Sequence, residues 1–229
     1  MKLASTLFAV AMLGVAGQAS AVSTWTWTST TQLTGLLGTG GAGVPNPTVV
    51  ASGFSNTDGT LNAAPGTLKI ETAYSTTVYS GGIGVRNRDD CALTSNAAGC
   101  DTLENTTPEH STDNAQRLDM ILLTFSQQVR LTSMSIGWSQ TDSDMTVLAY
   151  GASTTGVGGA TSVTTVRNNL DGNGVSANAK TYSQLTSSGW SLIGDYDNVS
   201  AVASGGSISG TKSINGGNLY SSAWLIGAY

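Results

Sequence analysis

Apolar and polar residues alternate with a period of two along most of this chain, which is the pattern of half-buried β-strands. In "TLKIETAY", Leu68 and Ile70 fall on the face opposite Lys69 and Glu71. The run "LDMILLTF" is instead apolar on both faces, which predicts a central strand that is covered on both sides. Further alternating or apolar runs predict strands at 23–28, 48–54, 131–138, 145–150, 161–167, 190–196, 206–214 and 223–229.

Clusters of Gly, Asn and Asp separate these runs, and no β-α-β rhythm is visible. The pattern therefore predicts an all-β fold, an antiparallel β-sandwich or jelly roll. One short helix is expected near 182–188, because Thr181 and Gln184 form a T-x-x-Q capping box and Gly189 offers a stop. The alternation also predicts a set of core residues: Leu122, Ile136, Trp138, Val147 and Trp224.

The first 21 residues have the pattern of a secretory signal peptide. Lys2 is followed by an apolar run from Leu3 to Val15, and the segment closes on the A-x-A pattern at 19–21. A membrane anchor is the alternative, but the apolar run is shorter than the roughly 20 residues that span a bilayer. We therefore expect export, with one β-sandwich domain over 22–229.

The composition supports an exported β-protein. The chain has 29 Gly, only 10% charged residues and a net charge of −5. An acidic chain without a basic patch does not hold a phosphate backbone, so nucleic acid is excluded as a partner. Cys91 and Cys100 are an even pair in an exported chain, which predicts a disulfide. A zinc site is the weaker alternative, because the sequence has a single His and no second Cys pair.

The acidic knot around Asp142 and Asp144 is the first candidate site. It joins two apolar runs in "SIGWSQTDSDMTVLAYGA", and its carboxylates could cap a turn, bind calcium or act as a catalytic pair. A turn is the favoured interpretation and calcium the second. Further calcium ligands would come from Asp113, Asn114 and Asp119.

A second acidic segment, at 88–119, surrounds the two cysteines. Its acidic residues and the single His are Asp89, Asp90, Asp101, Glu104, Glu109, His110, Asp113 and Asp119. A solvated loop held by the disulfide is the favoured interpretation, with calcium as the functional alternative. The stretch "LDGNGVS" opens like an EF-hand loop, but the twelfth position from Asp171 is Tyr182, so a turn between strands is expected instead.

The tryptophans offer a different chemistry. Trp25, Trp27 and Trp190 are candidates for a sugar-stacking platform, as in carbohydrate-binding modules, whereas core packing is the default for tryptophans inside apolar strands.

Several motifs together resemble the exosortase-dependent surface proteins of the PEP-CTERM class of Gram-negative bacteria. They are "GIGVRNRD", "PEHSTDN…RLDMILLTF", "LTSMSIGWSQTDSDMTVLAYGA", "KTYSQLTSSGWSLIGDY" and "SSAWLIGAY", in order over about residues 81–229. The resemblance implies export, sorting by an exosortase through a C-terminal tag, and association with biofilm and exopolysaccharide. It assigns no catalytic residues.

The chain departs from that class at its end. Members close with a Pro-Glu-Pro motif, an apolar helix and a basic tail, whereas the last proline here is Pro108 and the sequence stops at Tyr229 inside an expected strand. We therefore expect the sequence to be a piece of a longer protein. The expected function is that of a secreted, non-enzymatic surface or matrix protein, with the exosortase machinery and extracellular polysaccharide as partners. A calcium-assisted carbohydrate-binding module is the alternative, and a secreted hydrolase the remote one.

Overall fold

The computed structural model describes residues 23–40, 46–61, 63–79, 82–102, 112, 114, 116–136, 144–197, 199 and 210–228. Its main element is a seven-stranded sheet in the order β1-β2-β6-β11-β8-β9, with β3 also paired to β2. The strands of this sheet are β1 Leu36–Leu37, β2 Thr48–Asp58, β3 Lys69–Thr72, β6 Asp119–Val129, β8 Met145–Tyr150, β9 Trp190–Tyr196 and β11 Ser221–Ala228. Two separate two-stranded sheets are β4 Ser75–Tyr79 with β5 Gly82–Arg86, and β7 Ser133–Ile136 with β10 Gly210–Ser213, whose strands are far apart in sequence.

Every pairing between these strands is antiparallel. The helical elements are α1 Val163–Asn168 and the 3₁₀ turns η1 Thr30–Thr34, η2 Pro65–Thr67, η3 Gly172–Gly174, η4 Ser176–Asn178, η5 Tyr182–Gln184 and η6 Thr186–Ser188. The expected all-β, antiparallel and sandwich-like fold class is confirmed. None of the helices in the described part of the chain has the length and apolarity needed to cross a bilayer.

Strand β6 is the central strand that "LDMILLTF" predicted. It pairs with β2 on one side and with β11 on the other. Leu123 and Phe125 point into one hydrophobic cluster, and Met120 and Leu122 point into the other. Burial on both faces explains why this run lacks polar alternation.

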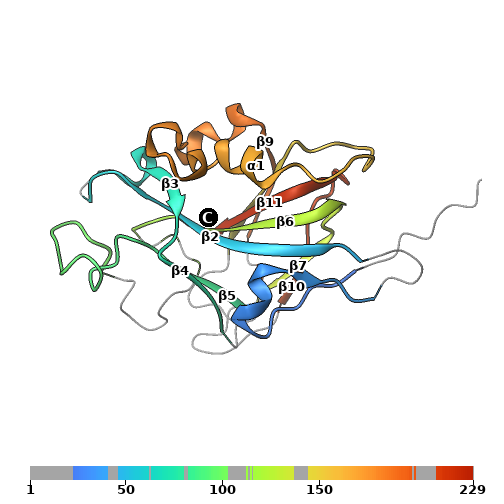
Figure 1. The fold of residues 1–229 in the computed structure, drawn as a ribbon, viewed down its shortest axis with the longest axis horizontal. Helices are drawn as coiled ribbons and strands as arrows, with labels where there is room; N and C mark the ends of the chain where they lie inside the picture. Colours follow the sequence, from blue (N-terminus) through green and yellow to red (C-terminus); the bar gives the residue numbers. More distant parts are fainter. Residues whose placement is uncertain are drawn as a thin grey trace, which may run out of the picture.

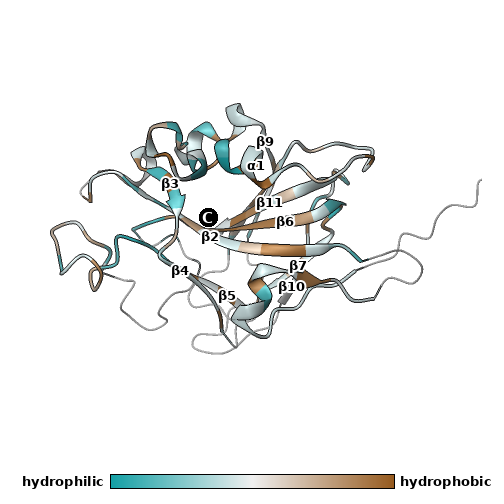
Figure 2. Cartoon of the chain, viewed as in Figure 1, coloured by the Kyte–Doolittle hydropathy of each residue, from teal (hydrophilic) through white to brown (hydrophobic). Residues whose placement is uncertain are grey.

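The sheet separates two layers of different character (Figure 1). Helix α1 and the 3₁₀ turns near it cover one face, where Val166, Leu170 and Leu185 pack on the sheet. Segment η1 and the sheets β4-β5 and β7-β10 lie on the other side, where partly buried Val78, Ile83 and Met134 join the core. Figure 2 shows hydrophobic residues concentrated along β2, β6 and β11, between these layers.

The segment 161–167 was expected to be a strand, and this expectation is wrong. It begins a helix, α1, because Ser162 caps the first turn by accepting a hydrogen bond from the Thr165 N–H at 3.1 Å. Burial of Val166 against the sheet completes the helix. Tertiary packing and the cap thus override the β-propensity of the run "VTTV".

The short helix expected near 182–188 is confirmed, whereas the strand expected at 23–28 is not formed. The helix near 182–188 exists as η5 and η6, with the Thr181 N–H bonded to the Gln184 side chain at 3.0 Å and Gly189 in the left-handed region at φ 91°. The expected strand at 23–28 is reduced to an isolated bridge between Thr24 and Thr39.

Three of the five expected core residues are confirmed as buried. Leu122, Val147 and Trp224 are at most 2% exposed. Ile136 is only half-buried, and Trp138 lies outside the described residues.

Candidate functional site

The disulfide loop is held at its base by a network of polar contacts. Cys91 and Cys100 are bonded, with their Cα atoms 5.0 Å apart, which confirms the expected disulfide. The Cys91 N–H donates to the Asp101 carbonyl at 3.1 Å, and the Asp101 N–H donates to the Asp89 carbonyl at 2.8 Å. The loop is therefore closed twice, by a covalent bond and by backbone pairing. A disulfide is typical of proteins in an oxidising compartment.

Two buried carboxylates stabilise the base of this loop. Asp90 accepts a hydrogen bond from the Ala92 N–H at 2.7 Å and one from the Arg86 side chain at 2.6 Å. Asp101 accepts one from the Asn87 amide at 2.9 Å. Asp90 is 0% and Asp101 1% exposed, so both carboxylates hold the chain rather than face solvent.

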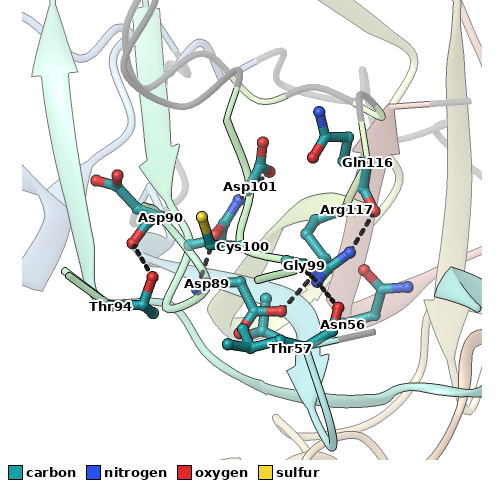
Figure 3. A network of polar contacts seen from close by, with 12 residues as sticks. Asn56, Thr57, Asp89, Asp90, Thr94, Gly99, Cys100, Asp101, Gln116 and Arg117 are labelled. Carbon is teal, nitrogen blue, oxygen red and sulfur yellow. Dashed lines mark hydrogen bonds and ion pairs between the residues drawn. The ribbon is translucent and has the colours of Figure 1, made fainter. Parts of the chain in front are cut away.

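The Asp89–Arg117 ion pair anchors the loop to the start of the central strand (Figure 3). The Arg117 Nε lies 2.6 Å from Asp89 Oδ2. The same guanidinium donates to the carbonyls of Gln116 at 2.9 Å, Leu61 at 2.9 Å and Gly99 at 3.1 Å. One side chain thus joins three segments that are far apart in sequence.

The environment of Asp89 is that of a desolvated carboxylate. Burial raises the pKa of the Asp89 carboxyl, the hydrogen bond and charge of Arg117 lower it in part, and Asp101 adds to the rise. The ion pair therefore offsets a desolvation cost, and losing Arg117 would leave that cost uncompensated.

These contacts correct the expectation of a solvated acidic loop. The part of the segment 88–119 nearest the disulfide is buried and paired, because Asp89, Asp90 and Asp101 each have a side-chain donor nearby. Glu104, Glu109 and His110 lie outside the described residues.

A polar cavity of about 180 Å³ lies between β3 and the turn that follows α1. Its lining residues are Asp58, Glu71, Thr72, Arg88, Asp171, Gly174 and Ser176. Glu71 accepts a hydrogen bond from the Thr57 hydroxyl at 2.8 Å and lies 3.4 Å from the Arg88 Nε. Burial raises the pKa of the Glu71 carboxyl, and Thr57 and Arg88 lower it only in part.

The expected calcium ligands are described only in part. Asp142 and Asp113 lie outside the described residues. Asp119 begins β6 and Asp144 directly precedes β8, and these two strands flank β11 at its C-terminal end, where Gly227 pairs with residues of both. The described residues contain no group of three acidic, His or Cys side chains placed to hold a metal ion. Calcium binding, with Asn114 among its ligands, stays a prediction.

The sugar-stacking platform is corrected at Trp190. This residue is 2% exposed, donates its indole N–H to the Asn169 carbonyl at 2.8 Å and packs edge-on against Tyr150 at 5.3 Å. Its ring is a core element because β9 places it beneath α1.

The other two tryptophans of that set are half-buried. Trp25 donates to the Pro47 carbonyl at 3.0 Å and packs edge-on against Phe125 at 5.0 Å. Trp27 packs against the same hydrophobic cluster. Both rings pack against the core, and we assign them no sugar-stacking role.

The stretch "LDGNGVS" forms a turn, as expected, but it follows a helix rather than a strand. Gly172, Asn173 and Gly174 all have positive φ, at 64°, 53° and 84°, and a Cβ at Gly172 would lie 2.7 Å from the Ala179 backbone nitrogen. Asp171 is buried at the base of this turn and pairs with Arg167.

The residues that sequence reasoning missed are chiefly cations and their partners. The pairs Arg86–Asp90 and Arg167–Asp171 are four positions apart, so their spacing was a usable signal. The Arg117–Asp89 pair and the cavity around Glu71 carry no such signal, because their members are distant in sequence.

Comparison of the chain with protein-family models, with curated proteins and with solved structures finds no match.

Proposed function

We propose that the chain is a secreted, non-enzymatic surface or matrix protein of a bacterium, handled by an exosortase-type sorting system. The observation that carries the extracellular part of the proposal is the Cys91–Cys100 disulfide, because disulfides form and persist in oxidising, extracellular settings. The signal-peptide pattern at 1–21 supports export.

A structural role for the acidic residues supports the non-enzymatic part of the proposal. Asp89, Asp90 and Asp101 are bound to Arg117, Arg86 and Asn87. A catalytic acid or base must reach its substrate, whereas these carboxylates are buried and occupied by contacts within the chain.

The resemblance to PEP-CTERM surface proteins supports the sorting system and the extracellular setting. Its most specific motif, "IGWSQTDSDMTVLAY", begins at the last residue of β7 and ends with β8. Association with biofilm and exopolysaccharide follows from the same resemblance.

The experiment is deletion of the exosortase gene in the host, with the complete reading frame expressed and the protein followed by an antibody in surface, matrix and membrane fractions. We expect the wild type to reach the surface or matrix, and the deletion strain to retain it in the membrane fraction. An unchanged distribution would refute exosortase handling. A matched chain with Cys91→Ser and Cys100→Ser separates failure of sorting from failure of oxidative folding.

A further inference from the structure

The polar cavity beside β3 brings charged residues from distant parts of the chain together. Asp58 ends β2, Glu71 and Thr72 belong to β3, Arg88 follows β5, and the turn at 171–176 closes the opposite wall. The bulge between Ser55 and Asp58 in the β2-β3 pairing carries the end of β2 past the regular ladder. This arrangement leaves room for a small ligand of about 180 Å³.

Most of the charged groups at the cavity already have partners within the chain. Asp171 is paired with Arg167 and accepts a hydrogen bond from the Thr72 hydroxyl at 3.3 Å. Lys69, beside the cavity, donates to the Ser176 carbonyl at 2.8 Å. These groups are held in place and form the walls.

Asp58 is different. Asp58 lines the cavity, and its Oδ2 atom is buried and accepts no hydrogen bond from the residues that the structure describes. Its charge also acts unfavourably on the neighbouring carboxylate of Glu71, which has only Thr57 and the more distant Arg88 to offset it. A buried carboxylate oxygen without a donor is costly, so a donor supplied by a ligand would be strongly favoured here.

We propose that this cavity binds the primary ammonium group of a small polar ligand, of the size and chemistry of a hexosamine. The ammonium group carries three hydrogen-bond donors, which match the carboxylates of Asp58 and Glu71. Arg88 lies in the same wall, and its side chain is 48% exposed, so it is placed to donate to an oxygen of the same ligand.

A metal ion fits the cavity less well. The described residues contain no group of three acidic, His or Cys side chains placed to hold one. The cavity is smaller than a drug-sized pocket, which limits the ligand to one ring or a short chain.

The inference does not rest on the proposed function, because it follows from the cavity alone. An exosortase deletion that leaves the protein's location unchanged would refute the sorting proposal and would not affect ligand binding. Conversely, a cavity that binds no amine would leave the sorting proposal intact.

The test is a titration of the ¹⁵N-labelled, oxidised protein with glucosamine, glucose, N-acetylglucosamine and calcium, read by NMR. We expect glucosamine to shift the amides of Asp58, Glu71, Thr72 and Gly174, with glucose and N-acetylglucosamine at least tenfold weaker. Asp58→Asn should weaken glucosamine binding at least tenfold, and Glu71→Gln should weaken it as well. Asp195→Asn is the matched control, because Asp195 is exposed on β9 and does not line this cavity.

Three outcomes would overturn the proposal: equal binding of glucose and glucosamine, no localised shift with glucosamine, or a response to calcium alone. The comparison of glucosamine with its N-acetyl form uses the wild-type chain. It therefore decides the question even if Asp58→Asn fails to fold.

Discussion

The Nε of Arg117 lies 2.6 Å from Oδ2 of Asp89, and the two side chains are only 5% and 9% exposed. The pair joins the disulfide loop to the segment directly before the central strand β6. The guanidinium also donates hydrogen bonds to the carbonyls of Leu61 and Gly99. A buried ion pair is weak evidence of net stabilisation, but removing one partner is expensive because the other charge stays buried. Removal of the Arg117 side chain should therefore destabilise this region strongly.

Substitution of Arg117 by Met should lower the free energy of unfolding by about 3–5 kcal/mol, because Asp89 is left as an unpaired buried charge. Urea unfolding of the oxidised protein measures this loss. The double variant Asp89→Asn, Arg117→Met should cost less than Arg117→Met alone, since no charge is then left unpaired.

Arg130→Met is the matched control. Arg130 is exposed, and its bond to Asn218 is 3.3 Å long, so the change should stay within about 1 kcal/mol. Equal losses for Arg117→Met and Arg130→Met would contradict the anchoring role of Arg117.

Glu71 should give the protein a specific dependence on pH. Burial raises the pKa of its carboxyl above the ordinary value of 4.5, so the folded chain holds this proton more tightly than the unfolded chain. The contribution of Glu71 to the free energy of unfolding is then greatest below the unfolded pKa. It declines as the pH rises through the window between the unfolded and the folded pKa.

Glu71→Gln should remove that decline. The wild type should therefore lose stability relative to Glu71→Gln between about pH 4 and about pH 7, as measured by urea unfolding at both values. Thr57→Val removes a hydrogen bond that lowers the pKa, so the Glu71 carboxyl should titrate at a still higher pH. A Glu71 carboxyl that titrates at or below its ordinary pKa in a ¹³C NMR titration would refute this explanation.

Trp190 should behave as a core residue. Trp190→Ala should cost about 3–5 kcal/mol of unfolding free energy, because it removes a ring that is packed beneath α1. Leu192→Ala, on the same strand but 52% exposed, should change it by no more than about 0.5 kcal/mol. Loss of polysaccharide binding by Trp190→Ala without loss of stability would restore the sugar-stacking interpretation.

Calcium binding at the acidic knot is tested by thermal unfolding with calcium and with a chelator. If Asp142 and Asp144 share an ion, calcium should raise the unfolding midpoint, since a ligand that binds only the folded chain stabilises it. The double variant Asp142→Asn, Asp144→Asn should abolish the rise. A midpoint that is the same in calcium and in chelator would leave this segment as a turn.

The strands were predictable where apolar alternation and turn residues agree. The runs at 145–150 and 190–196 are the strands β8 and β9 with the expected bounds, and the doubly apolar run became the central strand β6. Helix α1 was not predictable from its β-branched residues, because the Ser162 cap and the burial of Val166 decide its conformation.

The candidate site was predictable only in its local parts. The disulfide was predicted from an even cysteine count and the expectation of export, and it is present. The partner of Asp89 was not predictable, since Arg117 is 28 positions away and only the folded chain brings it near. The burial of Trp190 likewise depends on α1, which the strand pattern did not predict.

The most direct test of the account is the intact mass of the protein recovered from outside the cell. The account predicts an extracellular chain that begins at Val22, that has no free thiol, and that gains the mass of two hydrogens when Cys91–Cys100 is reduced. Recovery of the chain only inside the cell, with residues 1–21 still attached and both thiols free, would contradict it.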